Sequence, residues 1–431
     1  MSKVVSHRQS MIALMLAFAL CLSASLMTLR YPRSYLSPAN QSDFKVYFIA
    51  SNLVRGHLDA HLYDDAGTGV DPQLRFASDG SVIARMAHSK GIKRIQLYVY
   101  PAFLADVLLP LTLLSVSKAF WVWRFFNLLG VVVSAAFISR LLGLRLRSTP
   151  SLLVLMGLFC FSPLWQALFY GQITIMLLVL WSAGFLLYAQ GWKRTSALVL
   201  SVAALVKIAP LLIVLPILIW RDWRWIRWYA GGILAGFLLM CLKNSPGTVL
   251  FYFLRVIPPM STGVVDRQNK TVLAAIGMLW CHGLNYRGMV VPPHVVLIGK
   301  LLCAVLVGTA VLLVYESSRG LQKNGRVFVL AAFALLSLCV SPVSWVDALV
   351  VGYILLALLW NRMLAGGRRH SELLLLFATT VTTGVSVAIG SDSRRIDSFF
   401  FFQYAPLILS LLLVFFVLRR GVELSSKDAA V

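Results

Sequence analysis

The sequence predicts an all-α polytopic membrane protein with about 12 transmembrane helices, each of a length that crosses a ~30 Å hydrocarbon core. Of the 431 residues, 59% are hydrophobic and only 13% are charged, which is too little charge to cover a soluble chain of this length. Apolar runs of roughly 17–25 residues recur from one end of the chain to the other. Basic residues gather in the short connections between these runs, as they do in cytoplasmic loops.

The apolar runs give the candidate spans in order along the chain. They are 11–29, 120–141, 151–169, 172–189, 196–220, 228–243, 293–315, 327–341, 344–361, 373–389 and 402–418. The first follows Lys3 and Arg8, and with so many spans behind it we interpret it as an uncleaved signal anchor rather than a cleaved signal peptide. We expect residues 1–431 to form one integral membrane domain.

Charge sets the expected topology. The net charge of +23 lies mostly in short connections such as those around Arg145 and Lys193, so it indicates cytoplasmic loops and not a nucleic-acid partner. The stretch 98–114 is apolar but contains Asp106 and two prolines, and if it spanned, these basic loops would face outward. We therefore expect it to re-enter or to lie in the interface, and we expect 196–220 to be two short spans broken near Lys207–Pro210. Both termini then lie inside.

Two long loops fall on the outer side in this topology, residues 30–97 and 244–291. The remaining connections are short and no sizeable soluble domain is present, so any chemistry must lie between the membrane bundle and these two loops. Transporters commonly keep their loops short and bind at the membrane midplane between repeats. This chain has no clear internal repeat, and we expect its outer loops to form the active-site side.

Asp43 opens a short amphipathic segment in the first outer loop. Ser42 is a candidate N-cap, which puts Asp43 in the first helical turn. At helical spacing, Asp43, Tyr47, Ala50 and Val54 share one face. A first-turn carboxylate can simply complement the helix dipole; the alternative is a functional carboxylate on the outer face, with Tyr47 beside it.

Three further positions carry polar groups at places that suggest substrate binding. Gln172, after Gly171 in a turn between two spans, offers a donor and an acceptor to a sugar, although the pair can also be a tight interhelical turn. Lys207 is an intramembrane cation beside a proline break and could hold a phosphate or snorkel to the interface. Asp347 lies near the outer end of its span, where an unpaired carboxylate is costly.

In the second outer loop, Arg267 and Lys270 could meet a phosphate, or the loop could be solvated. His57 and His61 have the spacing of metal ligands on a helix, but Gly56 and the loop composition argue against a helix there. We expect no metal site and no cofactor. Neither a P-loop nor a dinucleotide-binding, HExxH or GxSxG pattern is present in the sequence, so ATP-driven transport and serine hydrolysis have no support.

Six motifs occur in an order that resembles a known family: DFKVYFIAS, YVYPAFLADVLLPLTLL, FYGQITIMLLVL, LVKIAPLLIVLPILIWRDWR, NKTVLAAI and SPVSWVDALV. Across roughly residues 40–360 the chain resembles the polyprenyl-phosphate-mannose-dependent alpha-mannosyltransferases, multi-spanning C-type glycosyltransferases with an arabinofuranosyltransferase branch. The resemblance implies a C-type glycosyltransferase-like bundle with interfacial helices on its outer face.

The resemblance also implies an inverting transfer of a sugar, mannose or another hexose, from a polyprenyl-phosphate donor to a lipid or glycan acceptor. It implies that Asp43 is the catalytic carboxylate and that Gln172 and Lys207 belong to conserved motif elements of the family. The chain departs from the pattern at Val346, Asp347 and Ala348, where many members have a histidine. Lys207, Arg267 and Lys270 are the candidate cations for the lipid phosphate that leaves.

Two other classes of function remain open at this point. One is a carrier or flippase for a lipid-linked or small anionic substrate, and the other is an assembly subunit of an envelope-polymer complex. For the enzyme, we expect an integral protein of a bacterial-type inner membrane whose active site lies on the outer face. Its partners are then the lipid-linked sugar donor, the acceptor and membrane lipids.

Overall fold

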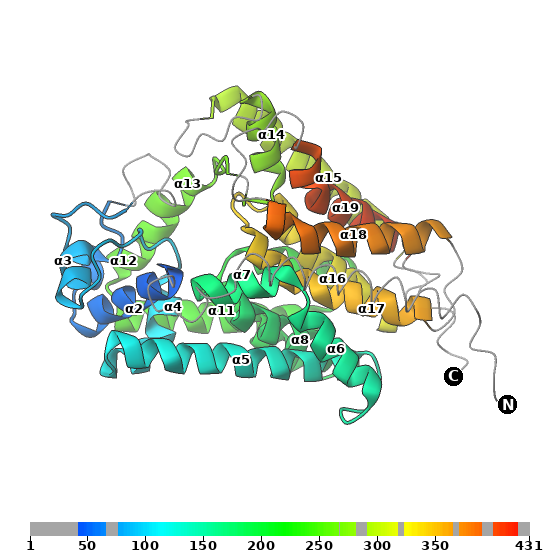
Figure 1. Ribbon diagram of the computed structural model, residues 1–431, viewed down its shortest axis with the longest axis horizontal. Helices are drawn as coiled ribbons and strands as arrows, with labels where there is room; N and C mark the ends of the chain where they lie inside the picture. The colour runs from blue at the N-terminus through cyan, green and yellow to red at the C-terminus, as the bar shows by residue number, and fades with distance from the viewer. Residues whose placement is uncertain are drawn as a thin grey trace.

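The computed structural model describes residues 42–65, 76–266, 268–281, 291–317, 323–364, 370–389 and 400–420. Within these residues the protein is helical, and its extended contacts are two isolated antiparallel bridges, Phe76 with Gln96 and Asn269 with Trp345. Figure 1 shows α5 along one long edge, α2 and α3 at one end, and α17 and α18 toward the other. The predicted all-α class is confirmed.

The helices follow one another with short connections. In chain order they are α2 (Ser42–Arg55), η3 (Asp59–His61), α3 (Val82–Ser89), α4 (Ala102–Val107), η4 (Leu109–Leu113), α5 (Val116–Leu141), α6 (Thr149–Phe159), α7 (Ser162–Tyr170), α8 (Thr174–Gln190), α9 (Lys193–Val206), η5 (Ala209–Ile213), α10 (Val214–Ile219), α11 (Trp223–Lys243), α12 (Pro246–Phe251), the π-helical turn η6 (Tyr252–Val256), α13 (Ile257–Met260), α14 (Val272–Trp280), α15 (Pro293–Ser317), α16 (Lys323–Val340), η8 (Val346–Gly352), α17 (Tyr353–Leu364), α18 (His370–Ile389) and α19 (Phe400–Arg419).

Four helical segments of the described chain are long and apolar enough to cross a membrane: α5, α11, α15 and the continuous segment of η8 and α17. The pair α6 and α7, which meets at a bend of 58°, gives up to five. The expected number of about 12 is therefore not confirmed, and the expected span 11–29 lies outside the described residues. Of the remaining apolar runs, 172–189 forms the 17-residue α8 and 151–169 is divided between α6 and α7. Hydropathy identifies an apolar run but does not show where its helix bends or ends.

Two of the expected interruptions are present. Helix α9 ends at Val206, Lys207 has an extended backbone (φ −152°, ψ 130°), and Pro210 lies in the 3₁₀ turn η5 that follows. The stretch 98–114 forms the six-residue α4 and the five-residue η4 instead of one continuous helix, so neither is long enough to cross a hydrocarbon core. Both breaks coincide with prolines, which remove a helical hydrogen bond.

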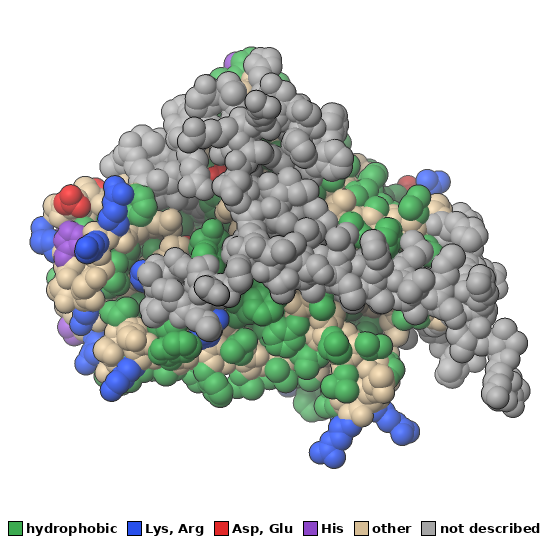
Figure 2. Space-filling model, in the orientation of Figure 1, with side chains coloured by type: hydrophobic (Ala, Val, Ile, Leu, Met, Phe, Trp, Pro, Cys, Tyr) green, Lys and Arg blue, Asp and Glu red, His purple; other side chains and the backbone are tan. Residues whose placement is uncertain are grey.

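Apolar side chains cover the outside of the long helices, as expected for contact with lipid tails. Phe125 of α5, Leu238 of α11 and Leu301 of α15 are each more than half exposed. Figure 2 shows hydrophobic side chains spread over the α5 face and Lys or Arg side chains at the connection from α5 to α6, which contains the exposed Arg145 and Arg147. The chain is an integral membrane protein.

Helices α8, α9 and α11 pack side by side through small residues. A Cβ atom built on Gly184 would lie 2.5 Å from Leu200, and one built on Gly232 would lie 2.2 Å from the Ser201 hydroxyl. Ser196 of α9 donates a hydrogen bond to the Gly184 carbonyl oxygen at 2.8 Å. Close approach through small residues, with hydroxyl hydrogen bonds across the interface, is the usual way helices associate in a bilayer.

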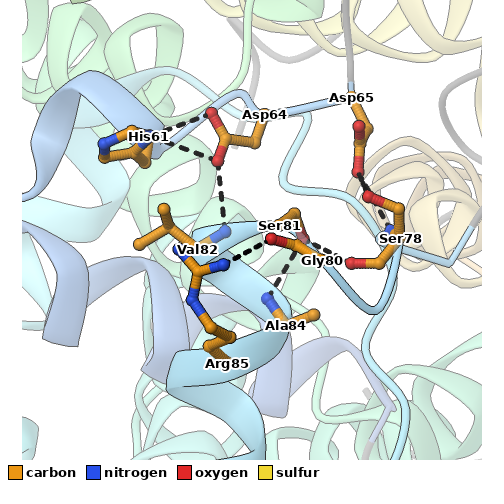
Figure 3. Close-up of polar contacts among 9 residues, drawn as sticks. All are labelled: His61, Asp64, Asp65, Ser78, Gly80, Ser81, Val82, Ala84 and Arg85. Atoms are coloured by element: carbon orange, nitrogen blue, oxygen red, sulfur yellow. Dashed lines mark hydrogen bonds and ion pairs between the residues drawn. The ribbon is translucent and has the colours of Figure 1, made fainter.

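The loop that follows α2 is fastened around the start of α3 by carboxylates (Figure 3). Both oxygens of Asp64 lie 3.2 Å from Nδ1 of His61, and one of them accepts from the Val82 backbone N–H at 3.3 Å. Asp65 accepts from the backbone and the hydroxyl of Ser78, at 2.9 and 2.7 Å. These contacts tie residues 61–65, after α2, to residues 78–82 at the start of α3.

Candidate active site

Asp43 lies in the first turn of α2, as expected, although the helix already includes Ser42, which was expected to be the N-cap. The rest of the helix is held inside the protein, with Phe44 and Tyr47 at 1% and 0% exposure. The Phe44 ring stacks on Trp123 of α5, with ring centroids 6.0 Å apart. This packing fixes the start of α2, so the helix gives the partly exposed Asp43 carboxylate a rigid support.

Gln172 is placed by the tight turn between α7 and α8. Gly171 ends α7 in the left-handed conformation (φ 68°, ψ 37°), which suits glycine because it has no Cβ atom. Its carbonyl oxygen accepts from Nε1 of Trp123 at 2.9 Å, so α5 holds the turn as well. The next residue, Gln172, is 6% exposed and turns toward α2.

A hydrogen-bond network joins Asp43 to the phenols behind it. Nε2 of Gln172 donates to Oδ2 of Asp43 at 2.7 Å. The Gln172 carbonyl accepts from the hydroxyl of Tyr47 at 3.0 Å and lies 3.5 Å from that of Tyr100. The two phenol oxygens are 3.1 Å apart, and the rings meet edge to face with centroids 5.0 Å apart. Two of the expected site residues, Tyr47 and Gln172, are thus in one network with Asp43.

Asp347 reaches the same place from the far end of the chain. It lies in the first turn of η8, is 2% exposed, and accepts from the hydroxyl of Thr174 at 2.6 Å. Residues 268–270 pair with the segment that precedes Asp347: the Lys270 N–H donates to the Ser344 carbonyl at 2.8 Å and the Val346 N–H donates to the Gln268 carbonyl at 2.9 Å. This short pairing places Gln268 beside the segment that carries Asp347.

These elements enclose a polar pocket of about 180 Å³. It is lined by Ser42, Asp43, Val46, Gln96, Leu97, Val99, Tyr100, Gln166, Tyr170, Gln172, Asp266, Gln268, Trp345 and Asp347. The volume is close to that of an engineered cavity of ~150 Å³ that binds one benzene molecule, so the pocket suits a single six-membered ring. Carboxylates, amides and hydroxyls are the groups that hydrogen-bond sugar hydroxyls.

A second, apolar cavity of about 530 Å³ adjoins the first. Its lining is mostly aliphatic and comes from η5, α13, α15 and α16, with Leu211, Ile257 and Val307 among its members. Val99, Tyr100 and Trp345 line both cavities, so the two share a wall. Lys207 also lines the apolar cavity and, within the described part of the chain, makes no ion pair.

The electrostatics of Asp43 are unusual for a carboxylate. Burial and the negative charge of Asp347 raise the pKa of Asp43, the Gln172 hydrogen bond and the positive charge of Lys207 act in the opposite direction, and the net result is a pKa of about 8. A raised pKa makes the ionised carboxylate a stronger base. The same result shows that Asp347 and Lys207 lie close enough to Asp43 for their charges to act on it.

Arg267 and Lys270 were also expected to be cations for the lipid phosphate. Arg267 lies outside the described residues. Lys270 is 1% exposed, its Nζ lies 5.3 Å from the centre of the Tyr404 ring, and it lines neither cavity. Burial lowers the pKa of Lys270 to about 7, and the charge of nearby Asp266 opposes this. Lys270 is therefore a core residue beside the site, whereas Lys207 lines the cavity.

Sequence reasoning did not identify Tyr100, Thr174 or Trp345. Thr174 follows Gln172 by two residues at the start of α8, and Trp345 precedes Asp347 by two, so both lie within the motifs that carried the resemblance. As for the histidines, α2 ends at Arg55, and the following backbone has left-handed φ at His57, so His57 and His61 do not share a helix. In the described residues no group of three potential metal ligands is close together.

The model of glycosyltransferase family 87 matches residues 98–342, more than half of the chain. The chain belongs to glycosyltransferase family 87. It is therefore a membrane glycosyltransferase of the C type, as the resemblance implied, although the mannosyltransferase branch is not identified by this match. No curated protein and no solved structure gives a significant match.

The matched range covers most, but not all, of the site. Tyr100, Gln172 and Lys207 lie inside it, while Asp43 lies well before its first residue and Asp347 lies just after its last. The roles of these two carboxylates therefore rest on the geometry of this chain. Both line the polar pocket, and each accepts a hydrogen bond from the α7–α8 region: Asp43 from Gln172 in the turn and Asp347 from Thr174 at the start of α8.

Proposed function

We propose that this glycosyltransferase moves one sugar, mannose or another hexose, from a polyprenyl-phosphate donor to a hydroxyl of a lipid or glycan acceptor. The observation that carries the proposal is the pair of adjoining cavities, one polar and sized for a single ring, the other apolar and about three times larger. A lipid-linked sugar has the same two parts. Its isoprenoid chain fits an aliphatic cavity, and its sugar fits the polar pocket.

The phosphate joins the two parts of such a donor, so it belongs where the cavities meet. Lys207 lines the apolar cavity at the break between α9 and η5, and its charge acts on Asp43 in the polar pocket. A lysine ammonium there can donate to phosphate oxygens and stabilise the charge that develops as the lipid phosphate leaves. Arg267, which lies outside the described residues, stays a second candidate for this role.

The reaction is a single displacement at the anomeric carbon. The acceptor hydroxyl attacks this carbon and loses its proton to the Asp43 carboxylate, while the bond from the carbon to the phosphate oxygen breaks and polyprenyl phosphate leaves. Attack opposite the leaving group inverts the anomeric configuration. Asp347, held by Thr174, lines the pocket and is positioned to accept from a sugar hydroxyl.

The proposal places the reaction on the outer face of a bacterial-type inner membrane, because the basic connections indicate the cytoplasmic side and the site lies with the two other loops. Cysteine-accessibility labelling of intact cells tests this. A cysteine at Arg145 should be protected from an impermeant reagent, and one at Ser78 should be labelled. The reverse pattern would overturn the assignment of the outer face.

Transfer itself is tested with purified protein in lipid nanodiscs, a panel of polyprenyl-phosphate hexoses and a glycolipid acceptor. The expected product carries the sugar with inverted anomeric configuration, which NMR determines. The competing function is a carrier, and it is tested with the same lipid-linked sugars in proteoliposomes. Movement of the lipid-linked sugar across the bilayer, without transfer to any acceptor, would favour the carrier and reject the enzyme mechanism.

A further inference from the structure

Gln172 has both ends of its amide occupied by protein groups, although it lines the polar pocket. Its NH₂ donates to Asp43 at 2.7 Å, and its carbonyl accepts from Tyr47 at 3.0 Å, with the Tyr100 hydroxyl 3.5 Å away. A residue that binds a sugar usually offers its polar atoms to the sugar hydroxyls. Here the short contacts are internal, and the residue is 6% exposed.

The ionised Asp43 carboxylate decides which way the amide faces, and the Tyr47 hydroxyl matches that orientation by donating to the amide carbonyl. An amide carbonyl only accepts hydrogen bonds, an NH₂ group only donates, and an ionised carboxylate only accepts. If the amide of Gln172 were reversed, its carbonyl would face the Asp43 carboxylate and two acceptors would meet. With the observed orientation, every contact in the chain from Tyr47 through Gln172 to Asp43 pairs a donor with an acceptor.

We propose that Gln172 is a positioning residue for the base and not a ligand of the sugar, with Tyr47 and Tyr100 fixing its amide. The amide holds Oδ2 of Asp43, and Oδ1, which has no hydrogen-bond partner among the described residues, is left for the acceptor hydroxyl. This assignment rests on the proposed function, because it takes Asp43 to be the base.

The electrostatics of the site agree with this geometry. The Gln172 hydrogen bond stabilises the ionised form of Asp43 and so lowers its pKa, against burial and the charge of Asp347, which raise it. Removing the NH₂ donor must therefore raise the pKa of Asp43 further. Among the described residues, the other charged groups near Asp43 are Lys207 and, at the same pocket, Asp266, and replacing Gln172 leaves both in place.

The first test needs no substrate. Dicyclohexylcarbodiimide modifies protonated carboxyl groups in apolar surroundings, and mass spectrometry of the peptide containing Asp43 measures the extent of modification against pH. In the wild-type protein we expect the modification to fall with a midpoint near pH 8. In Gln172→Met, which keeps the side-chain length but has no donor, the midpoint should move up by about one unit, since a charge-assisted hydrogen bond is lost.

The matched control is Gln166→Met. Gln166 is also a buried glutamine at the pocket, but its Nε2 donates to Oε1 of Gln268, at 3.4 Å, and not to Asp43. Its replacement should leave the midpoint where it is in the wild type. If Gln172→Met does not fold, as judged by gel filtration and thermal unfolding, the double variant Tyr47→Phe, Tyr100→Phe takes its place. It removes the hydroxyls that hold the amide carbonyl and should shift the midpoint in the same direction.

Kinetics with a transferable donor give a second, separate result. A positioning residue predicts that Gln172→Met lowers kcat by roughly 10–100-fold while the donor KM changes little, because the base is misplaced but the sugar contacts remain. If Gln172 instead binds the sugar, Gln172→Met should raise the donor KM. An unchanged midpoint with a raised KM would overturn the assignment and leave the proposed function standing. A shifted midpoint in a protein that transfers no sugar would leave the contact established and reject the function.

Discussion

The substitution Asp43→Asn tests the central step of the mechanism with little change in shape. The Asn side-chain oxygen can still accept from the Gln172 amide, which lies 2.7 Å from Oδ2 of Asp43. What is lost is the proton acceptor. A positioned base contributes about 10²–10⁴-fold in rate, so the variant should bind donor almost normally and lose at least ~100-fold of its maximal turnover.

The size of the measured loss depends on pH. With the pKa of Asp43 raised to about 8 by burial and by Asp347, about a tenth of the free enzyme carries the ionised base at pH 7 and about nine-tenths at pH 9. The wild-type kcat/KM should therefore rise about tenfold between these pH values, while that of Asp43→Asn stays flat. The ratio of wild type to variant should consequently be about ten times larger at pH 9 than at pH 7.

Thermal unfolding supplies the control for folding. A carboxyl group whose pKa is raised by the fold destabilises the folded state above its unfolded pKa of about 4, and this cost grows until the pH passes the folded value of about 8. Replacing it by a neutral amide should keep or raise the unfolding temperature at pH 9. A well-folded Asp43→Asn protein with the wild-type rate at pH 9 would remove Asp43 from the mechanism and leave Asp347 as the next carboxylate to test.

Three further substitutions separate roles that lie close together in the structure. Lys207→Ala should raise the donor KM roughly 10–100-fold, the value of a charge-assisted hydrogen bond to phosphate; an unchanged KM would reject the phosphate contact. Lys270→Met should leave the donor KM unchanged, because Lys270 lines neither cavity, and should keep or raise the unfolding temperature at pH 7, because the burial that lowers the pKa of this lysine costs stability. Gly232→Ala should cost roughly 1–3 kcal/mol of stability by overpacking, since its Cβ would lie 2.2 Å from Ser201, whereas Gly231→Ala, with open space around it, is the control that should cost nothing.

Features set by local sequence were predicted well. The membrane class follows from composition, the start of α2 from Ser42 and Asp43, and the end of α9 from the proline at 210. Each depends on a few neighbouring residues or on an average over the chain. The number of spans is different in kind, because hydropathy measures how apolar a run is and not whether the helix bends, as α6 and α7 do at 58°.

The arrangement of the site depends on contacts that no local pattern contains. Sequence reasoning selected Asp43, Gln172 and Asp347 separately, but not the hydrogen bonds that bring α2, the α7–α8 turn and η8 together. For Lys270, the local sequence suggested the wrong environment. Its polar neighbours suggested an accessible loop, yet the pairing of this loop with residues 344–346 carries the lysine into the core. Tyr100 and Trp345 were missed because their role is to line two cavities at once.

The position of the donor phosphate can be tested through the base itself. The pKa of Asp43 in the free enzyme is already raised by the charge of Asp347, and a bound phosphate beside Lys207 would add another negative charge nearby and offset the lysine. The pKa of Asp43 should therefore be higher in the enzyme–donor complex than in the free enzyme. Since kcat reports the complex and kcat/KM the free enzyme, the acidic limb of kcat should lie at higher pH than the limb of kcat/KM near pH 8. Profiles of transfer rate from pH 6 to 10 measure both limbs. A kcat limb at lower pH would mean that the donor brings no net negative charge near Asp43, and the phosphate would then have to lie away from Lys207.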